Sequence, residues 1–167
     1  MPKTEQGVTN NRYQIIPRCL IFITDQDRVL LLKGAPTKRL WANRYNGIGG
    51  HIECGEDLMS AARRELLEES GLQSPDLRLV GTVMVDAGDS VGIGIFIFRG
   101  GYSGAAWIES QEGSLEWIPI EALKQFALVE DLKTIIPVVL GMKPSDPPFS
   151  ARYFYDEADK LQIVFGD

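Results

Sequence analysis

Three glutamates stand close together in the segment GGHIECGEDLMSAARRELLEESGL, which covers residues 49–72. Glu68 and Glu69 follow Glu65 by three and four positions, a spacing that places all three side chains on one face of an α-helix. Like charges at this spacing destabilise a helix by roughly 0.2–0.5 kcal/mol per pair. Clustered carboxylates are preferred ligands of Mg²⁺ and Mn²⁺, so a divalent cation would offset the repulsion. A solvated acidic face is the alternative for these glutamates taken alone.

The glutamates lie in a segment with the pattern of a helix. We expect this helix over residues 57–70, with Gly71 as its C-terminal cap. Met59, Ala62 and Leu66 recur at helical spacing and predict its buried stripe. The acidic face is expected to be offset from this stripe, so that the helix packs through one side and presents carboxylates on another.

The surrounding residues fit a family pattern, Gx5Ex7REUxEExGU, in which U is an aliphatic residue. All nine defined positions are met within 23 residues, by Gly50, Glu56, Arg64, Glu65, Leu66, Glu68, Glu69, Gly71 and Leu72. This pattern is the Nudix box, and the chain resembles the Nudix (MutT-like) hydrolases. The resemblance implies an α/β/α sandwich with a mixed central sheet, a catalytic helix after a Gly-Gly loop, and a C-terminal helix followed by a hairpin.

The resemblance also implies a metal site at the box. Its ligands would be the carboxylates of Glu65, Glu68 and Glu69 and the main-chain carbonyl of Gly49. In the family, the bound Mg²⁺ or Mn²⁺ bridges the phosphates of a nucleoside diphosphate linked to another group. The cation lowers the pKa of a bound water and neutralises charge as the phosphorus–oxygen bond breaks. One glutamate, or a metal-bound hydroxide, accepts the proton of the water, and the residues leave this choice open.

Further residues are expected to support this site. Arg64 is placed to pair with Glu56 and hold the loop on the helix, although Glu56 as an ordinary surface acid is the alternative. Relatives take an additional metal-binding acid from a loop beyond the box, where this chain has WIESQEGSLEW with Glu109, Glu112 and Glu116. Glu112 matches that place best, with Glu109 next, and a plain loop acid is the alternative for each.

Within the family, the pattern is most similar to that of the branch that cleaves oxidised purine nucleoside triphosphates such as 8-oxo-dGTP. In that branch an Asn before the Gly of the strand leading to the box binds the base, and Asn46 occupies this place. Leu40 stands where the branch has an aromatic residue, with Trp41 beside it, and Asp131 would read the base. Val129 replaces an aromatic residue of the branch. The alternatives are a turn-forming Asn46, a packing role for Trp41 and, for Asp131, the role of a helix N-terminal cap or of an acid in the first turn.

Several basic residues surround the loop that precedes the box. They are Lys33, Lys38, Arg39 and Arg44. In an acidic chain they are suited to bind a triphosphate, and loop solubility is the alternative. His51 is expected to flank the phosphates rather than to act as the base.

The rest of the chain predicts an α+β domain. Strand patterns cover residues 12–24, 28–33, 77–86, 90–100 and 114–120, and a final hairpin lies within 151–167. Further helical patterns cover 120–126 and 130–141, the second with Pro137 inside it. Because strands surround the helices without regular βαβ alternation, we expect a layered α+β domain over residues 13–167, after a flexible tail of residues 1–12.

The composition limits the classes of molecule that the chain is expected to bind. The net charge of −6 and the pI near 4.9 argue against binding of nucleic-acid polymers. No apolar run approaches the roughly 18 residues of a membrane span. Cys19 and Cys54 do not suggest a disulfide framework, so a cytoplasmic location is expected. Oligomeric state is not indicated.

These observations predict a metal-dependent hydrolase that converts a modified purine nucleoside triphosphate to a monophosphate and pyrophosphate. Two alternatives remain open at this point. One is a Nudix hydrolase of a nucleotide sugar or dinucleotide, and the other is a Nudix module that binds a nucleotide without cleaving it.

Overall fold

The computed structural model describes residues 2, 5–7, 11–88, 90–105, 108 and 112–166. Its strands and helices follow the order expected from the sequence. They are β1 (Gln14–Asp25), β2 (Arg28–Gly34), β3 (Tyr45–Asn46), α1 (Leu58–Ser70), β4 (Arg78–Val85), β5 (Val91–Gly101), β6 (Gly113–Pro119), the 3₁₀ helix η2 (Ile120–Gln125), α2 (Leu132–Gly141), β7 (Phe149–Tyr155) and β8 (Leu161–Phe165). The short strand β3 lies in a segment with no strand pattern. The division at residue 13 between a tail and a domain stays a prediction.

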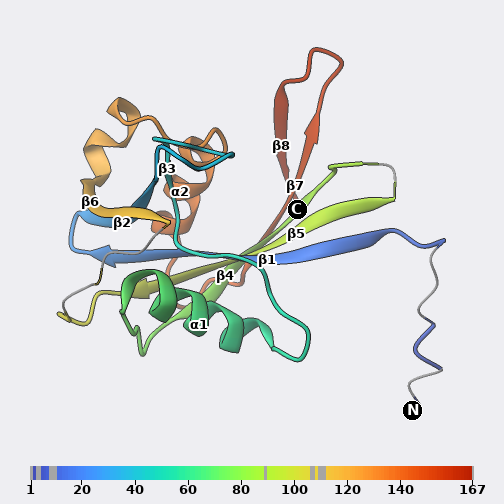
Figure 1. The fold of residues 1–167 in the computed structure, drawn as a ribbon, viewed down its shortest axis with the longest axis horizontal. Helices are drawn as coiled ribbons and strands as arrows, with labels where there is room; N and C mark the ends of the chain where they lie inside the picture. Colours follow the sequence, from blue (N-terminus) through green and yellow to red (C-terminus); the bar gives the residue numbers. More distant parts are fainter. Residues whose placement is uncertain are drawn as a thin grey trace.

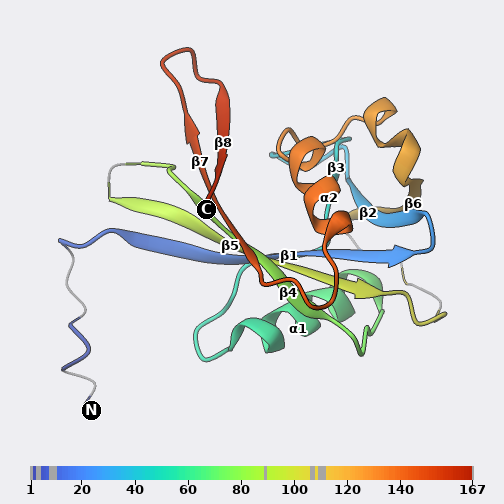
Figure 2. The ribbon, with the colours of Figure 1, turned by 180° about the vertical axis from the view of Figure 1, so that it is seen from behind.

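The strands form one mixed sheet in the order β3-β2-β1-β5-β4-β7-β8, and β6 also pairs with β2. The pairs β1–β5 and β4–β7 are parallel, and the other pairs are antiparallel. Helix α1 covers one face, whereas α2 and η2 lie on the other (Figures 1 and 2). The β7–β8 hairpin extends away from the body of the sheet on the same side as α2 (Figure 1). The expected α+β class with a mixed sheet is confirmed.

The central strand β1 contributes to the core on both faces of the sheet. Leu20 and Phe22 pack in the cluster that contains α2. Ile21 and Ile23 pack in the cluster that contains α1. Alternation along an extended strand explains this division, because successive side chains point to opposite faces. Burial of such side chains contributes about 1.5–3 kcal/mol each, so β1 holds the two layers together.

The ends of α1 are fixed by local contacts. Asp57 Oδ1 accepts hydrogen bonds from the main-chain N–H groups of Met59 (2.9 Å) and Ser60 (3.0 Å), as an N-terminal cap does. At the other end, Gly71 has a left-handed φ of 70° and donates its N–H to the carbonyl of Leu67. The predicted cap at Gly71 is therefore confirmed.

The expected separation of the acidic face of α1 from its buried stripe is wrong for one glutamate. Glu69 is only 9% exposed and is buried together with Ala62 and Leu66, whereas Met59 is half-buried. Positions 62, 66 and 69 are related by four and three residues, so they share one helix face. The packing face of α1 thus carries a carboxylate at its edge.

Helix α2 begins at Leu132, two residues later than the pattern predicted, and contains Pro137. Its C-terminal end is held by Arg99 of β5, whose Nη1 donates to the carbonyls of Val139, Leu140 and Met142 at 3.1–3.2 Å. Within the part of the chain that the structure describes, no helix is both long and apolar enough to cross a membrane.

Candidate functional site

A cavity of about 560 Å³ lies on the α2 side of the sheet and reaches the loop that precedes α1. Its residues come from distant parts of the chain. The box contributes Gly49, Gly50, Glu65 and Glu69, the elements β3, α2 and β7 contribute Asn46, Asp131 and Tyr153, and the apolar floor contains Val85, Ile93 and Ile95. A volume of roughly 300–1,000 Å³ with a few convergent polar groups is typical of small-molecule sites.

The two glycines at the box end allow the carboxylates to approach the main chain. Gly49 has a φ of +146°, and a Cβ there would lie 2.2 Å from the carbonyl oxygen of Cys19. A Cβ on Gly50 would lie 2.6 Å from Oε1 of Glu65. The N–H of Gly49 donates to Oε2 of Glu69 at 2.9 Å. A side chain at Gly50 would therefore displace the Glu65 carboxylate, and one at Gly49 would clash with the main chain of β1.

Glu69 is the most buried of the three box glutamates. Burial disfavours its charged form and raises its pKa to about 7, against the lowering effect of the hydrogen bond from Gly49. The charges of Glu65 and Glu112 raise the pKa further, and that of Lys38 lowers it. A carboxylate kept away from water and close to other acids is stabilised by a cation, which fits the metal site predicted at the box.

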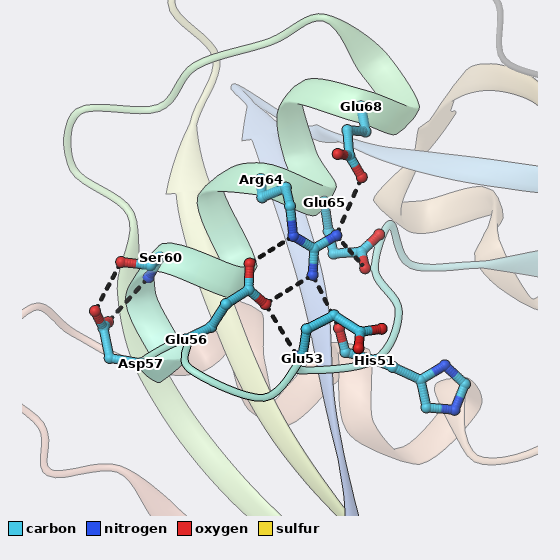
Figure 3. Close-up of polar contacts among 8 residues, drawn as sticks. All are labelled: His51, Glu53, Glu56, Asp57, Ser60, Arg64, Glu65 and Glu68. Atoms are coloured by element: carbon cyan, nitrogen blue, oxygen red, sulfur yellow. Dashed lines mark hydrogen bonds and ion pairs between the residues drawn. The ribbon is translucent and has the colours of Figure 1, made fainter.

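Arg64 contacts three acids of the box, Glu56, Glu65 and Glu68 (Figure 3). Its Nε and Nη2 donate to the two oxygens of Glu56 at 2.7 and 2.9 Å, so the predicted pairing is present. Its Nη1 donates to Glu65 at 2.9 Å and to Glu68 at 3.1 Å, and Nη2 also donates to the carbonyl of His51 at 3.1 Å. Arg64 lowers the pKa of Glu56 to about 2. The loop before α1 is thereby tied to the helix.

The predicted metal ligands differ in exposure and in partners. The side chain of Glu65 is 13% exposed and that of Glu68 is 59% exposed, and both contact Arg64. No three His, Cys, Asp or Glu side chains among the described residues are gathered tightly enough to hold an ion as they stand. The donor set is nevertheless all oxygen, as Mg²⁺ and Mn²⁺ prefer. Binding of a cation would require Glu65 and Glu68 to turn from Arg64 towards Glu69.

The loop residues predicted to bind phosphate are only partly brought to the cavity. Lys38 and Arg44 line it, and Lys38 forms an ion pair with Glu112, which lines it as well. Lys33 instead places its Nζ 5.5 Å from the centre of the Tyr45 ring. Neither Lys33 nor the exposed Arg39 lines the cavity.

The other candidate acids beyond the box lie elsewhere. Glu116 accepts a hydrogen bond from the hydroxyl of Tyr45 at 2.8 Å and does not line the cavity. Glu109 lies outside the described residues. Glu112, immediately before β6, is thus the loop acid that the fold brings to the box end.

The cavity is lined by most of the residues predicted to contact a base. Asn46 lines the cavity, and its Oδ1 accepts the N–H of Gly47 at 2.9 Å, as a turn-forming Asn does. Trp41 also lines it and is 44% exposed. Leu40 lines only a smaller adjoining cavity of about 80 Å³. Val129 is buried and forms part of the wall.

Asp131 occupies the N-terminal position of α2 but makes no capping hydrogen bond with its side chain. It lines the cavity, and burial raises its pKa. Burial and the nearby Asp131 carboxylate also raise the pKa of Tyr153 on β7. The helix-capping alternative for Asp131 is therefore not the arrangement found.

Comparison with known proteins agrees with this architecture. A family profile described as the NUDIX domain matches residues 15–139, three quarters of the chain. The chain belongs to the Nudix family. Among its Nudix relatives is the oxidized purine nucleoside triphosphate hydrolase of Danio rerio, 32% identical over 125 residues that cover 74% of this chain and 79% of the relative. The protein of the same name from Mus musculus is 31% identical over 143 residues, covering 85% and 88%.

Solved Nudix structures share the fold. The MutT protein of Bacillus halodurans superposes with a TM-score of 0.75 at 24% identity, covering 90% of this chain and 97% of that protein. The NUDIX domain of Shewanella oneidensis NrtR, solved with ADP ribose, gives a TM-score of 0.63 at 20% identity, covering 84% and 97%. At these identities the likeness shows the fold alone.

Two cavity residues of this Nudix domain, Arg18 on β1 and Tyr153 on β7, were not among the sequence candidates. The alternation of a strand gives the face on which a side chain lies, but not what stands opposite it. Their place in the cavity follows from the parallel pairing of β1 with β5 and of β4 with β7. No local sequence pattern predicts these strand pairs.

Proposed function

We propose that this chain hydrolyses a nucleoside triphosphate to a nucleoside monophosphate and pyrophosphate, with modified purine nucleotides as its preferred substrates. The names of the zebrafish and mouse relatives support this substrate class. The observation that carries the proposal is a single cavity of about 560 Å³ that joins the box carboxylates to Asn46 and Asp131. One site thereby offers carboxylates to a metal-bound polyphosphate and amide and carboxyl groups to a base.

The box end would hold a divalent cation, Mg²⁺ or Mn²⁺. We assign its ligation to the carboxylates of Glu65, Glu68 and Glu69, the carbonyl of Gly49 and, from the loop before β6, Glu112. When bound, the cation lowers the pKa of a water molecule and neutralises charge on the phosphates. The proton of the attacking water passes to one of the box glutamates.

Arg64 and Glu56 would act by positioning these carboxylates. The guanidinium contacts Glu65 and Glu68 while its paired hydrogen bonds to Glu56 fix the loop. Planar, paired contacts of this kind hold a guanidinium in one orientation. Arg64 would thereby hold Glu65 and Glu68 beside the loop until they turn to a bound cation.

The remaining residues would bind the nucleotide. Lys38 and Arg44, which line the cavity, would contact the phosphates. Asn46 and Asp131 would form hydrogen bonds with the edge of the base, and the ring of Trp41 would pack against its plane. Each of these five side chains lines the same cavity.

We also infer small-molecule nucleotides rather than a nucleic-acid polymer as partners, because the net charge is −6. Cys19 and Cys54 are both free, which agrees with a cytoplasmic, reducing environment.

A substrate panel tests the proposal. Purified protein with Mg²⁺ is incubated with ordinary and oxidised purine triphosphates, a nucleotide sugar and a dinucleotide, and the products are identified. We expect monophosphate and pyrophosphate from an oxidised purine triphosphate, and Glu69→Gln to lower this rate by at least about 100-fold, whereas the exposed control Glu121→Gln leaves it unchanged. Cleavage of only the nucleotide sugar or dinucleotide would replace the proposed substrate. Absence of any cleavage would instead support a binding module.

A further inference from the structure

Arg18 lies where β1 passes the Gly49–Gly50 turn. The main chain of Arg18 forms an isolated antiparallel bridge with His51, and the N–H of Cys19 donates to the carbonyl of Gly50 at 2.9 Å. On its other side, Arg18 is paired with Ile95 of β5, part of the apolar floor. The strand thus places Arg18 between the box end of the cavity and its floor.

The side chain of Arg18 lies on the cavity side of the sheet. Arg18 and Leu20 both line the cavity, and residues two apart on a strand share a face. Leu20 packs in the core cluster that contains α2, whereas the intervening Cys19 packs in the cluster that contains α1. A cationic group is therefore presented by a strand that the core holds on both faces.

The side chain of Arg18 is also unusual, because its Nε has no hydrogen-bond partner across the described part of the chain. This buried nitrogen differs in that from the buried hydroxyl of Tyr153, which lies near the carboxylate of Asp131. Arg18 and Tyr153 both line the cavity, on opposite sides of its floor, since Val85 of β4 pairs with Ile93 on one side and with Tyr153 on the other. A buried donor without an acceptor costs free energy, and this cost is larger for a charged group. A ligand with an acceptor atom at this place would satisfy Nε of Arg18.

Two other cations near the box carboxylates have acidic partners, whereas Arg44, which also lines the cavity, is exposed and lies on the loop before β3. Lys38 pairs with Glu112, and Arg64 pairs with Glu56, Glu65 and Glu68. Arg18 forms no ion pair with any residue that the structure describes. A guanidinium presents a planar set of donors that suits phosphate oxygens, and a strand holds it more rigidly than a loop does.

We propose that Arg18 binds the α-phosphate, the phosphate that joins the nucleoside to the rest of the substrate. This inference rests on the proposed function, because it assumes a nucleotide in the cavity. With the terminal phosphates at Glu65 and Glu69 and the base at Asn46 and Asp131, Arg18, which β1 presents beside the Gly50–His51 turn, is a cation within the cavity that can contact the segment between them. Its effect is on substrate affinity, and proton transfer remains with the box glutamates.

Equilibrium binding tests this role without catalysis. A purine nucleoside 5′-monophosphate and the corresponding nucleoside are titrated, in chelator, into the wild type, Arg18→Met, Arg18→Lys and the control Arg152→Met. Arg152 lies on β7 with a 60% exposed side chain that pairs with Asp86 at 3.2 Å. We expect Arg18→Met to weaken monophosphate binding by about 10- to 100-fold and nucleoside binding by less than about twofold. Arg18→Lys should recover part of the difference, and Arg152→Met should change neither.

An equal loss for the two ligands, or no loss for either, would overturn the assignment. Thermal unfolding of each variant checks the fold, and if Arg18→Met is unfolded, the selective loss must appear in Arg18→Lys as a smaller effect. The test is separate from that of the proposed function. A wild type that binds the monophosphate selectively through Arg18 but hydrolyses no triphosphate contradicts the proposed reaction alone, and a wild type that binds neither ligand contradicts the role of Arg18.

Discussion

Two acids that line the cavity, Glu69 and Asp131, are both removed from water, and their pKa values are raised mainly by burial. An acid in this position lowers the stability of the folded state once it is ionised, because the charge is less well solvated than in the unfolded chain. Asp131 makes no capping bond, and Glu69 lies at the edge of the packing face of α1, where it accepts a hydrogen bond from the N–H of Gly49. Binding sites commonly carry such a cost, which a ligand relieves.

Asp131→Asn should reveal this cost at one residue. The folded pKa of Asp131 lies above the unfolded value, so its stabilising effect is complete below about pH 3.9 and is lost as pH rises through the folded pKa. We therefore expect Asp131→Asn to melt higher than the wild type at pH 8, by about 2–4 °C for each kcal/mol, and to show little difference at pH 4. Thermal unfolding at the two pH values measures this. The exposed control Asp27→Asn should shift by the same small amount at both, and an equal shift for Asp131→Asn would refute the expectation.

Single residues also show which parts of the candidate site could be predicted from the sequence and which could not. The box residues were identified because their roles depend on spacing within one loop and helix, and the pairing of Arg64 with Glu56 follows from that spacing. Arg18 and Tyr153 were not identified. They line the cavity because strand pairs bring together residues that are far apart in the chain, such as Arg18 and Ile95. An isolated Arg in an apolar strand gives no local sign of its ligand.

At the scale of elements, α1 and the loop before it act as one unit. The Asp57 cap fixes the start of the helix and Gly71 its end, as the sequence predicted for Gly71. Arg64 joins the loop to the middle of the helix through Glu56 and the carbonyl of His51. The buried position of Glu69 was not predicted, because the stripe was taken as narrower than the face that the sheet covers.

Arg64→Lys should separate charge from geometry in this unit. Lys keeps the positive charge but cannot make the paired contact with Glu56 while reaching Glu65 and Glu68. We expect the Mg²⁺ concentration for half-maximal hydrolysis to rise, or the rate at saturating Mg²⁺ to fall, by about 10- to 100-fold. The neighbouring exposed Arg63→Lys is the matched control and should behave as the wild type does. Wild-type activation by Mg²⁺ in Arg64→Lys would show that the contact network does not support catalysis.

At the scale of the whole molecule, the cavity depends on the order of strands in the sheet. The α+β class, both helices and the closing hairpin were predicted from local patterns. The parallel pairs β1–β5 and β4–β7 were not, although they bring residues 14–24 beside 91–101 and residues 81–85 beside 149–153. Such pairing is decided by packing over the entire domain. Family resemblance supplied what periodicity could not, a mixed sheet between helical layers.

The central claim is that the box acids are gathered to hold a divalent cation together with a triphosphate. Binding of Mn²⁺ to the wild type, Glu69→Gln and the control Glu121→Gln, each with a non-hydrolysable purine triphosphate, tests it most directly. We expect the wild type and Glu121→Gln to bind Mn²⁺ equally well, and Glu69→Gln to bind it at least about 10-fold more weakly with an unchanged fold. Equal Mn²⁺ affinity in all three proteins would contradict the account.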